Sequence, residues 1–401
     1  MDPDFVNLLP ATCTNNLTPR SRVHKYLQDT LETVLTQLTL SEDATITLKR
    51  RAANATTTFH LDPSTGALES GQAESTITYS FPGKDAYEAW RFTIALRILS
   101  AVHDALQKGL PVSIRDIYYT DPEYFESQGV VGRFVDKLAL TIGVERADLN
   151  VEAAAKGLVA GYYRLTTTRG EVIDARGSTT DSLIPRVQDI TELDISDVRW
   201  ILIIEKEAVF RRLARDNFHN RAAAGKGILI TGKGYPDLAT RAFARRILEN
   251  IAPSQSQTPS QSQSSPSHIQ SPIFYALVDG DPDGTAIMST YKYGSMAHTC
   301  ENARLNLPCL RWLGLRTSEV IGGIGHDGDE ALIPLSKRDR KKIVSMLGRS
   351  PMLAVDGSEM EWRTELQLML MLNVKAEIEI LHDRAGGLEG WLDREMGRRK
   401  S

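Results

Sequence analysis

Three acidic side chains follow apolar runs in this sequence and could together bind a metal ion. Glu205 comes directly after "ILII", and Asp279 and Asp281 follow "IFYALV" in the segment "LVDGDPDG". If both runs are strands of one parallel sheet, these carboxylates lie at its carboxyl edge, where ligands of α/β sheets bind. An oxygen-only set suits Mg²⁺, which keeps coordination positions for water and phosphate. The alternative is that the aspartates cap turns and helices, which is the role we favour for Asp283.

Two adjacent tyrosines in "RDIYY" (115–119) raise the question of a nucleophile. A phenol has a pKa of about 10 and is a poor nucleophile at neutral pH unless a cation or a base assists it. Arg115 stands four residues before Tyr119 and could supply positive charge to a phosphate. The alternative, which the spacing alone favours, is that both tyrosines are core aromatics and that Arg115 pairs with Asp116 at the surface.

A lysine between glycines is a third candidate. The segment "GILITGKG" (227–234) nearly matches a phosphate-binding P-loop, but Gly234 stands where that motif has Ser or Thr. Its middle, "ILIT", is typical of a strand, so the P-loop interpretation is poor. Lys233 could still approach a backbone phosphate, or it could lie in a plain turn, and both interpretations stay open.

The bulk composition excludes several classes of protein. With 401 residues and 41% hydrophobic content, the chain is long and apolar enough for two or three domains. The net charge of −4 gives no overall sign of nucleic-acid binding, so such a surface would need local asymmetry. The three cysteines are too few and too scattered for a disulfide framework or a zinc cluster. Because signal and membrane-spanning patterns are absent, we expect a soluble protein of a reducing compartment with no membrane partner.

The elements that would position the tyrosines are mostly helical. Apolar periodicity predicts helices over residues 84–109, 122–143 and 147–157, and alternation over 157–175 predicts a β-hairpin. Helices closed by a hairpin form a winged helix-turn-helix, a fold that presents one helix to the DNA major groove. We therefore assign residues 85–180 to a DNA-binding winged-helix domain.

Residues 1–84 are predicted to be an N-terminal extension. Residues 1–19 have no periodicity and resemble a loose tail, whereas residues 20–40 have helical spacing. Residues 52–82 are rich in Ala, Thr, Ser and Gly, and we interpret them as a weakly ordered linker or hairpin.

The elements that would position the acids alternate between strand and helix. Strands are predicted at 198–205, 227–231, 273–281 and 309–313, with helices between them. This alternation indicates a parallel sheet with covering helices, so the fold class is α/β multidomain.

The domain that contains this sheet is assigned to residues 190–401. A Ser/Gln/Pro-rich segment at 253–272 has no apolar content to bury and is interpreted as a disordered insertion. Residues 358–381 are predicted to be one amphipathic helix beneath the sheet.

Seven segments in order now resemble one family. They are "IRDIYY", "KGLVAG", "LIIEKEAVF", "ITGKGYPDLATR", "LVDGDPDG", "YKYGSM" and "LRWLGL". They resemble the A-type polypeptide of type IIB DNA topoisomerases (topoisomerase VI), and more closely its eukaryotic relative, the transesterase that makes meiotic DNA double-strand breaks. The resemblance covers residues 85 to 385 or so, and its seven ordered motifs make it specific.

The resemblance implies both the fold and the roles of single residues. It implies a winged-helix (catabolite-activator-like) domain followed by a Toprim domain with a Rossmann-like parallel sheet. The nucleophile falls on Tyr119, with Tyr118 as a packing neighbour and Arg115 as a phosphate contact. The Mg²⁺ ligands, which could also bind Mn²⁺, fall on Glu205, Asp279 and Asp281. A DNA contact falls on Lys156 in "KGLVAG".

The resemblance also implies the reaction and the partners. Tyr119 would attack double-stranded DNA to form a 5′-phosphotyrosyl link, and tyrosine and metal would come from opposite protomers of a homodimer. Because no ATP-binding pattern is present, strand passage would need a B-type subunit with an ATPase fold. Meiotic accessory proteins and a nuclear location are expected. The insertion at 253–272 and Asp283, where relatives often have an aromatic residue or His, depart from the family pattern.

Three other functions stay open at this point. The chain could be a topoisomerase VI A-type subunit, or a DNA-binding recombination subunit that has lost cleavage. The joint presence of Tyr119 with the three acids argues against the second of these. It could also be a Toprim nuclease in which metal-bound water attacks and Tyr119 is structural.

Overall fold

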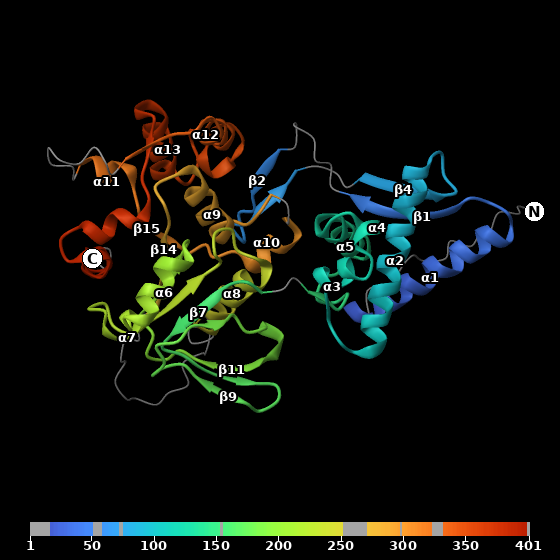
Figure 1. Cartoon of the computed structure of the whole chain (residues 1–401), viewed down its shortest axis with the longest axis horizontal. Coiled ribbons are helices and arrows are strands. Elements are labelled where there is room, and N and C mark those ends of the chain that lie inside the picture. Colours follow the sequence, from blue (N-terminus) through green and yellow to red (C-terminus); the bar gives the residue numbers. More distant parts are fainter. Residues whose placement is uncertain are drawn as a thin grey trace, which may run out of the picture. The chain divides into compact units, whose positions relative to one another are not determined.

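The computed structural model describes residues 17–50, 58–71, 75–152, 155–251, 271–296, 299–322 and 332–398. The chain divides into two compact units (Figure 1). Unit 1 comprises Met1–Ala55 and Gln72–Ala154, and unit 2 comprises Thr56–Gly71 and Ala155–Ser401. The tail predicted over 1–19 and the insertion predicted over 253–272 lie almost entirely outside the described residues.

Unit 1 packs three long helices against a two-stranded antiparallel sheet. Its elements are α1 (Pro19–Thr39), β1 (Ala44–Arg50), β4 (Ser75–Phe81), α2 (Ala86–Lys108), β5 (Val112–Ser113), α3 (Ile114–Tyr119), α4 (Pro122–Phe125), α5 (Gln128–Ile142) and β6 (Val151–Glu152). Strand β1 pairs with β4 in antiparallel register, and β5 pairs with β6 in parallel. One apolar core joins α1, α2, α5 and the β1–β4 sheet.

Local sequence explains the ends of the central helix of unit 1. Asp85 is the N-cap of α2, and its carboxylate accepts a hydrogen bond from the backbone N–H of Glu88 at 2.8 Å. Gly109 ends the helix in the left-handed region, with φ of 64°. On the face between these ends, Ile94, Ile98 and Val102 are buried at helical spacing.

Unit 2 is built on a six-stranded sheet. Its first elements are β2 (Phe59–Leu61), β3 (Leu68–Ser70), β7 (Leu158–Gly161), β8 (Arg164–Thr167), β9 (Val172–Asp174), β10 (Ser182–Leu183), η1 (Val187–Asp189), β11 (Ile190–Asp194), β12 (Trp200–Ile204), α6 (Glu207–Arg215), α7 (Phe218–Arg221), β13 (Gly227–Thr231) and α8 (Leu238–Ile251). The remaining elements are β14 (Ile273–Leu277), α9 (Pro282–Lys292), α10 (Thr299–Leu305), β15 (Arg311–Gly314), α11 (Thr317–Gly322), β16 (Ile333–Pro334), α12 (Lys337–Arg349), η4 (Pro351–Leu353), α13 (Met360–Leu372), β17 (Val374–Lys375), η5 (Ile378–Asp383) and α14 (Gly387–Arg398).

The sheet has the strand order β10-β7-β13-β12-β14-β15. Strands β13, β12, β14 and β15 run parallel. At one edge β7 pairs antiparallel with β13, and β10 pairs antiparallel with β7. The four strands predicted from the sequence are these four parallel strands, so the parallel sheet is confirmed.

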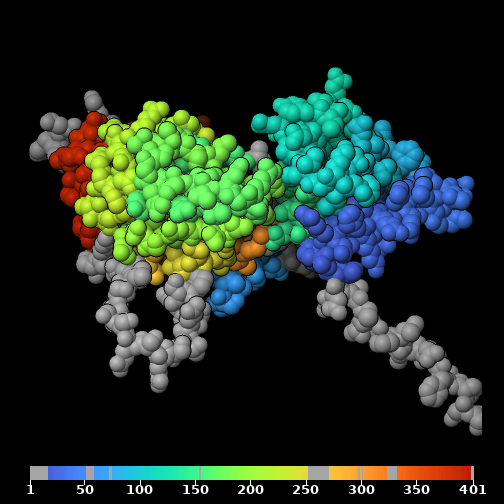
Figure 2. All heavy atoms as spheres, turned by 90° about the horizontal axis from the view of Figure 1, so that it is seen from below, coloured from blue at the N-terminus to red at the C-terminus, as the bar shows by residue number. Residues whose placement is uncertain are grey.

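Helices cover both faces of this sheet because its central strands are apolar on both faces. On one face, Ile201 and Ile203 of β12 pack in a core that also contains residues of α8, α9 and α13. On the other face, Leu202 and Ile204 pack in a core with α6, α7 and α14. In the space-filling view, α14 lies beside α6 and α7 (Figure 2). A hydrogen bond joins α14 to the segment after α7, because Asp393 accepts from the backbone N–H of Ala223 at 2.9 Å.

The two units differ in their boundaries from the predicted domains 1–84, 85–180 and 190–401. Most of the described part of the predicted extension belongs to the core of unit 1, to which Val23, Ile46 and Tyr79 contribute. Residues 58–71 instead form the β2–β3 hairpin of unit 2, where the backbone carbonyl of Leu68 accepts a hydrogen bond from Asn302 at 2.8 Å.

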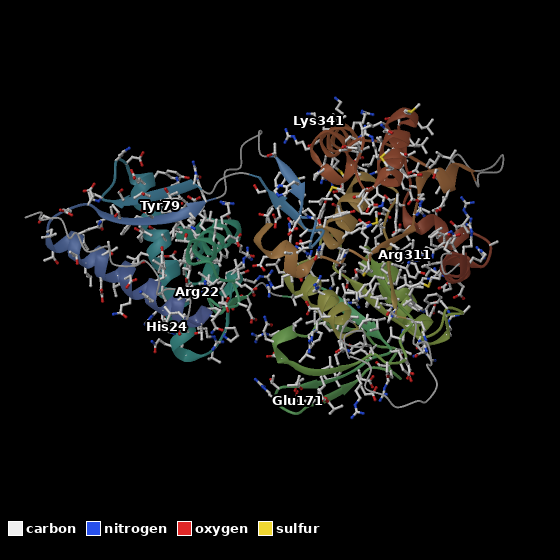
Figure 3. The ribbon with its side chains drawn as sticks, turned by 180° about the vertical axis from the view of Figure 1, so that it is seen from behind. Arg22, His24, Tyr79, Glu171, Arg311 and Lys341 are labelled. Carbon is white, nitrogen blue, oxygen red and sulfur yellow. The ribbon has the colours of Figure 1, made fainter. Side chains whose placement is uncertain are left out.

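The predicted hairpin over 157–175 is shorter than expected. Strands β8 and β9 form it, with Glu171 in the connecting turn (Figure 3). The residues before β8 instead form β7, which pairs with β13 of the large sheet. This hairpin therefore belongs to unit 2, and not to the unit that contains the tyrosines.

The prediction of one helix over 358–381 is wrong in its second half. Helix α13 ends at Leu372 because Asn373 adopts a left-handed conformation, with φ of 58°. The chain then forms β17, and Ala376 exchanges backbone hydrogen bonds with Gly280. This departure from helix brings a new segment to the carboxyl edge of the sheet.

None of the helices in the described ranges combines the length and the apolar composition that are needed to span a lipid bilayer.

Candidate functional site

Three predicted acids meet at the carboxyl edge of the parallel sheet in unit 2. Glu205 follows β12 and Asp279 follows β14, and these strands are neighbours with Ile204 opposite Leu277. This register places the ends of the two strands side by side, and the backbone N–H of Asp279 donates to Oε2 of Glu205 at 2.9 Å. Asp281 follows two residues later as the N-cap of α9.

A backbone N–H holds one oxygen of each carboxylate. Oε2 of Glu205 accepts from Asp279, and Oδ1 of Asp279 accepts from Ile378 at 2.8 Å. Oδ1 of Asp281 accepts from Gly284 at 2.7 Å. The second oxygen of each group is therefore left for another partner. For Asp281, helix capping and metal binding are compatible, because they use different oxygens.

Burial makes these carboxylates costly as free anions. It is the main cause that raises the pKa of Glu205 and of Asp279. The negative charges of Asp279 and Asp281 raise the pKa of Glu205 further, and the charge of Asp281 raises that of Asp279. Burial raises the pKa of Asp281 as well. A cation at this edge would offset the cost of holding three negative charges so close together.

Two lysines supply positive charge to this site. Nζ of Lys206 lies 3.2 Å from Oδ2 of Asp279, and Nζ of Lys375 lies 3.7 Å from Oδ2 of Asp281. Lys375 could not be selected from the sequence, because it lay inside an expected helix. Lys206 could have been noticed, since it directly follows Glu205.

The residues present fit Mg²⁺ by their chemistry, although they do not form a ready-made cage. Among the described residues, no three acidic, histidine or cysteine side chains already stand in an arrangement that would hold a metal ion. The carboxylates Glu205, Asp279 and Asp281 nevertheless form an oxygen-only donor set that is buried and oriented by backbone groups.

Asp283 does not cap the helix, contrary to the role favoured from the sequence. It lies in the first turn of α9, where Asp281 is the N-cap. Its Oδ1 accepts from the hydroxyl of Tyr235 at 3.2 Å and forms an ion pair with Lys342 of α12. Although burial opposes the change, these partners lower the pKa of Asp283.

In unit 1, Tyr119 is the last residue of α3 and is 60% exposed. It makes no side-chain hydrogen bond with any residue that the structure describes. Tyr118 packs against the core of unit 1, with its ring 5.3 Å from the ring of Tyr119. Tyr118 is therefore half-buried against the core, whereas Tyr119 is exposed.

Arg115 shares α3 with Tyr119 and is exposed. The two residues stand four apart, so their side chains lie on the same face of the helix. The expected pair between Arg115 and Asp116 is not formed, because the carboxylate of Asp116 accepts from the backbone N–H of Ser113 at 3.0 Å. This contact is half of a capping box that begins α3, and it leaves the guanidinium available to a phosphate.

The two predicted DNA-contacting lysines both lie in unit 2. Lys156 is exposed, and its backbone N–H donates to Asp237 at 2.8 Å. Lys233 lies in a turn that contacts the site, because the backbone N–H of Gly234 donates to the backbone carbonyl of Glu205 at 2.9 Å. Its ammonium is 3.2 Å from Glu207, so it forms an ion pair in this structure.

The structure thus forms two groups from the predicted site residues. Arg115 and Tyr119 share one helix of unit 1. Glu205, Asp279 and Asp281 share one edge of the sheet of unit 2, with the turn of Lys233 beside them.

Comparisons with known families match both units. Residues 90–151 match the family described as type IIB DNA topoisomerase. Residues 200–253 and 266–386 match the Toprim domain of the family that unites Spo11 with the A-type subunit of topoisomerase 6. The predicted fold class, a winged-helix domain followed by a Toprim domain, is therefore confirmed.

Several curated relatives are similar along most of their length. The meiotic recombination protein SPO11 of Homo sapiens is 32% identical over 374 residues, which cover 93% of this chain and 86% of the human protein. The meiotic recombination protein rec12 of Schizosaccharomyces pombe is 32% identical over 379 residues, which cover 93% of this chain and 94% of rec12. The A-type subunit of DNA topoisomerase 6 from Arabidopsis thaliana is 32% identical over 291 residues, which cover 72% of this chain and 61% of that protein. With both units matched in order and relatives similar over nearly the whole chain, this protein belongs to the Top6A/Spo11 family.

Proposed function

We propose that this protein cleaves double-stranded DNA by transesterification through Tyr119 and so makes the breaks that begin meiotic recombination. The observation that carries the proposal is the different burial of the two adjacent tyrosines. Tyr118 is half-buried against the core, whereas Tyr119 is 60% exposed on the same helix as the exposed side chain of Arg115. The similarity to meiotic recombination proteins of human and fission yeast supports the meiotic role.

In the proposed reaction, the phenolic oxygen of Tyr119 attacks the phosphorus of a DNA phosphodiester. The bond between phosphorus and the 3′-oxygen breaks, the phenol loses its proton, and the 3′-oxygen gains one. The products are a 5′-phosphotyrosyl link and a free 3′-hydroxyl, and no water is consumed. Arg115 would stabilise the negative charge that develops on the phosphate.

The acids of unit 2 would hold the divalent cation. Glu205, Asp279 and Asp281 would bind Mg²⁺, or Mn²⁺ in its place, through the carboxylate oxygens that no backbone group holds. When bound, the ion would supply positive charge for the phosphate. Since the nucleophile and these acids belong to different units, we propose that each cleavage site takes its tyrosine and its acids from opposite protomers of a homodimer.

Basic residues near the acids would contact the phosphate backbone. Besides Lys156 and Lys233, helix α12 presents Lys337, Arg338 and Lys341 to solvent, and Figure 3 shows Lys341 on the outer side of that helix. The helix is tied to the site by the pair between Lys342 and Asp283. Because such contacts go to phosphates, we expect weak sequence preference. The location would be the nucleus, where chromosomal DNA is.

An apolar stripe on α1 supports a protein partner. Leu31, Leu35 and Leu38 recur at helical spacing and are each about half exposed, at 52%, 54% and 50%. The stripe adjoins the face of α1 that Val23, Leu27 and Val34 bury in the core of unit 1. We propose that the stripe binds a B-type subunit, with accessory proteins added to that complex. Replacing Leu31 and Leu35 by Glu should prevent co-purification with a co-expressed B-type subunit, and unchanged co-purification would refute this surface.

The deciding experiment is a cleavage assay on end-labelled plasmid DNA with Mn²⁺ and the B-type partner. It compares wild type, Tyr119→Phe and the matched neighbour variant Tyr118→Phe, with denaturant added before protease digestion. We expect protein on the 5′ ends for wild type and Tyr118→Phe only. Equal cutting by Tyr119→Phe with free 5′-phosphates would instead establish a hydrolytic Toprim nuclease.

The same material tests strand passage. A topoisomerase VI A-type subunit is the second candidate, because the corresponding protein of Arabidopsis thaliana is 32% identical over 72% of this chain. ATP-dependent relaxation of supercoiled plasmid by the reconstituted complex would favour that candidate, whereas protein-linked linear DNA without relaxation would favour meiotic breakage.

A further inference from the structure

The carboxylate oxygens proposed for the metal are already paired with ammonium groups of this chain. Oδ2 of Asp279 pairs with Lys206, and Oδ2 of Asp281 pairs with Lys375, whereas Oδ1 of each aspartate accepts from the backbone. The two lysine side chains are only 23% and 19% exposed. A divalent cation and the lysines would therefore compete for the same atoms.

Each lysine also has a second acidic partner away from those oxygens. Nζ of Lys206 lies 2.5 Å from Glu379 and 3.2 Å from Glu377, and these two glutamates are about half exposed. Nζ of Lys375 lies 3.3 Å from Asp339. Asp339 is fixed in the capping box of α12, where its carboxylate accepts from the backbone N–H of Ser336. Each ammonium could leave its aspartate and stay paired.

We propose that Lys206 and Lys375 are built-in counter-cations that neutralise Asp279 and Asp281 until a divalent cation displaces them onto Glu379 and Asp339. This inference rests on the metal role proposed above for Glu205, Asp279 and Asp281. It assigns a positioning role to five residues outside the predicted site: Lys206, Lys375, Glu377, Glu379 and Asp339.

The physical reason is electrostatic competition in a partly buried site. Two like charges repel strongly at short range where water is scarce, so a cation cannot enter while the ammonium remains on the same carboxylate. The lysines therefore lower cation affinity, and in exchange they stabilise the carboxylates in the metal-free protein. The glutamates beside Lys206 act in the opposite direction, because they hold the displaced ammonium.

The test is the affinity of the full chain for Mn²⁺, measured by isothermal titration calorimetry without DNA. Lys206→Met should bind Mn²⁺ about tenfold more tightly than wild type, because one competing charge at close range is removed. Glu379→Gln should bind it more weakly, by about threefold, because the ammonium then stays on Asp279. Lys292→Met is the matched control, since Lys292 pairs with Glu359 in the same unit, and its affinity should equal that of wild type.

The double variant separates this mechanism from a general effect of charge. If Glu379 acts through Lys206, Lys206→Met/Glu379→Gln should bind Mn²⁺ as tightly as Lys206→Met alone. An equal weakening by Glu379→Gln in both backgrounds would overturn the inference. Glu379 is half exposed, so its variant keeps the test valid even if Lys206→Met folds poorly.

The remaining outcomes distinguish this inference from the proposed function. If wild type binds Mn²⁺ and the variants bind it equally, the counter-cation role fails and the metal site stands. If neither wild type nor Lys206→Met binds Mn²⁺, the metal site itself fails and the inference falls with it. Binding by Lys206→Met alone would support the inference in its strongest form.

Discussion

The backbone N–H of Asp279 donates a hydrogen bond to Oε2 of Glu205 over 2.9 Å, and this contact joins the ends of two neighbouring parallel strands. Gly284 in the first turns of α9 packs against both residues. A Cβ at this position would lie 2.4 Å from the carbonyl oxygen of Asp279 and 3.1 Å from Oε2 of Glu205. The close approach of helix and acids therefore requires glycine.

Gly284→Ala should destabilise unit 2, because the added methyl group overlaps the backbone of Asp279. We expect a loss of about 1–3 kcal/mol in the free energy of unfolding, measured by urea denaturation, together with weaker Mn²⁺ binding. The control is Gly348→Ala, at a helical position of α12 where a Cβ would meet nothing within 4 Å. That variant should be unchanged or slightly more stable, and equal losses in both would refute the packing argument.

The capping box of α3 gives a second prediction. The hydroxyl of Ser113 accepts a hydrogen bond from the backbone N–H of Asp116 at 2.9 Å and so fixes the helix that carries Tyr119. Ser113→Ala should cost about 1 kcal/mol of stability and reduce cleavage, because the position of Tyr119 becomes less defined. Thermal unfolding and the yield of protein-linked ends measure the two effects.

Ser127→Ala is the matched control for Ser113→Ala. Ser127 is the N-cap of α5, but its side chain makes no capping hydrogen bond. The control should therefore leave both stability and cleavage close to wild type. If the two serine variants behaved alike, the capping box would not position Tyr119.

Cation binding should depend on pH through Glu205. Burial, followed by the charge of Asp279, raises the pKa of Glu205 from 4.5 to about 8. The folded metal-free protein therefore holds a proton that the unfolded chain has lost, so the contribution of this group to stability decreases as pH rises from about 4.5 to 8. Cation binding to the folded protein expels that proton, so Mn²⁺ affinity should rise as pH approaches about 8 and level off above it.

Calorimetry at a series of pH values measures this dependence. The affinity of wild type should increase with pH, whereas Glu205→Gln should bind Mn²⁺ more weakly and with a flatter pH profile. A profile for Glu205→Gln as steep as that of wild type would show that another group titrates.

The exposed charge of α12 should contribute to DNA affinity in a salt-dependent way. Lys337→Ala/Lys341→Ala removes two exposed cations. Each lost phosphate contact should decrease the slope of log affinity against log salt by about 0.9, so the slope should fall by about 2. Fluorescence anisotropy with duplex DNA measures it. Arg215→Ala/Arg221→Ala, which removes two exposed charges beside the other face of the sheet, should leave the slope unchanged.

The sequence alone determined the elements whose signal is local. The apolar runs before Glu205 and Asp279 predicted two buried parallel strands, because residues that face helices on both sides of a sheet must be apolar on both faces. Strand ends then placed the acids at one edge, and this was enough to predict that Glu205, Asp279 and Asp281 lie together. The order of the seven motifs was enough to identify the family.

Spacing could not separate Tyr118 from Tyr119. Adjacent residues on a helix have similar local signals, and their burial depends on what α3 packs against. In the structure Tyr118 is half-buried against the core of unit 1, whereas Tyr119 is exposed.

Only the tertiary structure decided what surrounds the acids. Residues 374–381 have a helical apolar pattern, but Asn373 ends α13 and the following chain pairs through Ala376 with Gly280. Ile378 and Lys375 thereby reach Asp279 and Asp281, which are almost one hundred residues away in the sequence. Periodicity records which side of an element is buried, whereas contacts between distant segments depend on how the elements pack, and so these partners of the site could not be predicted.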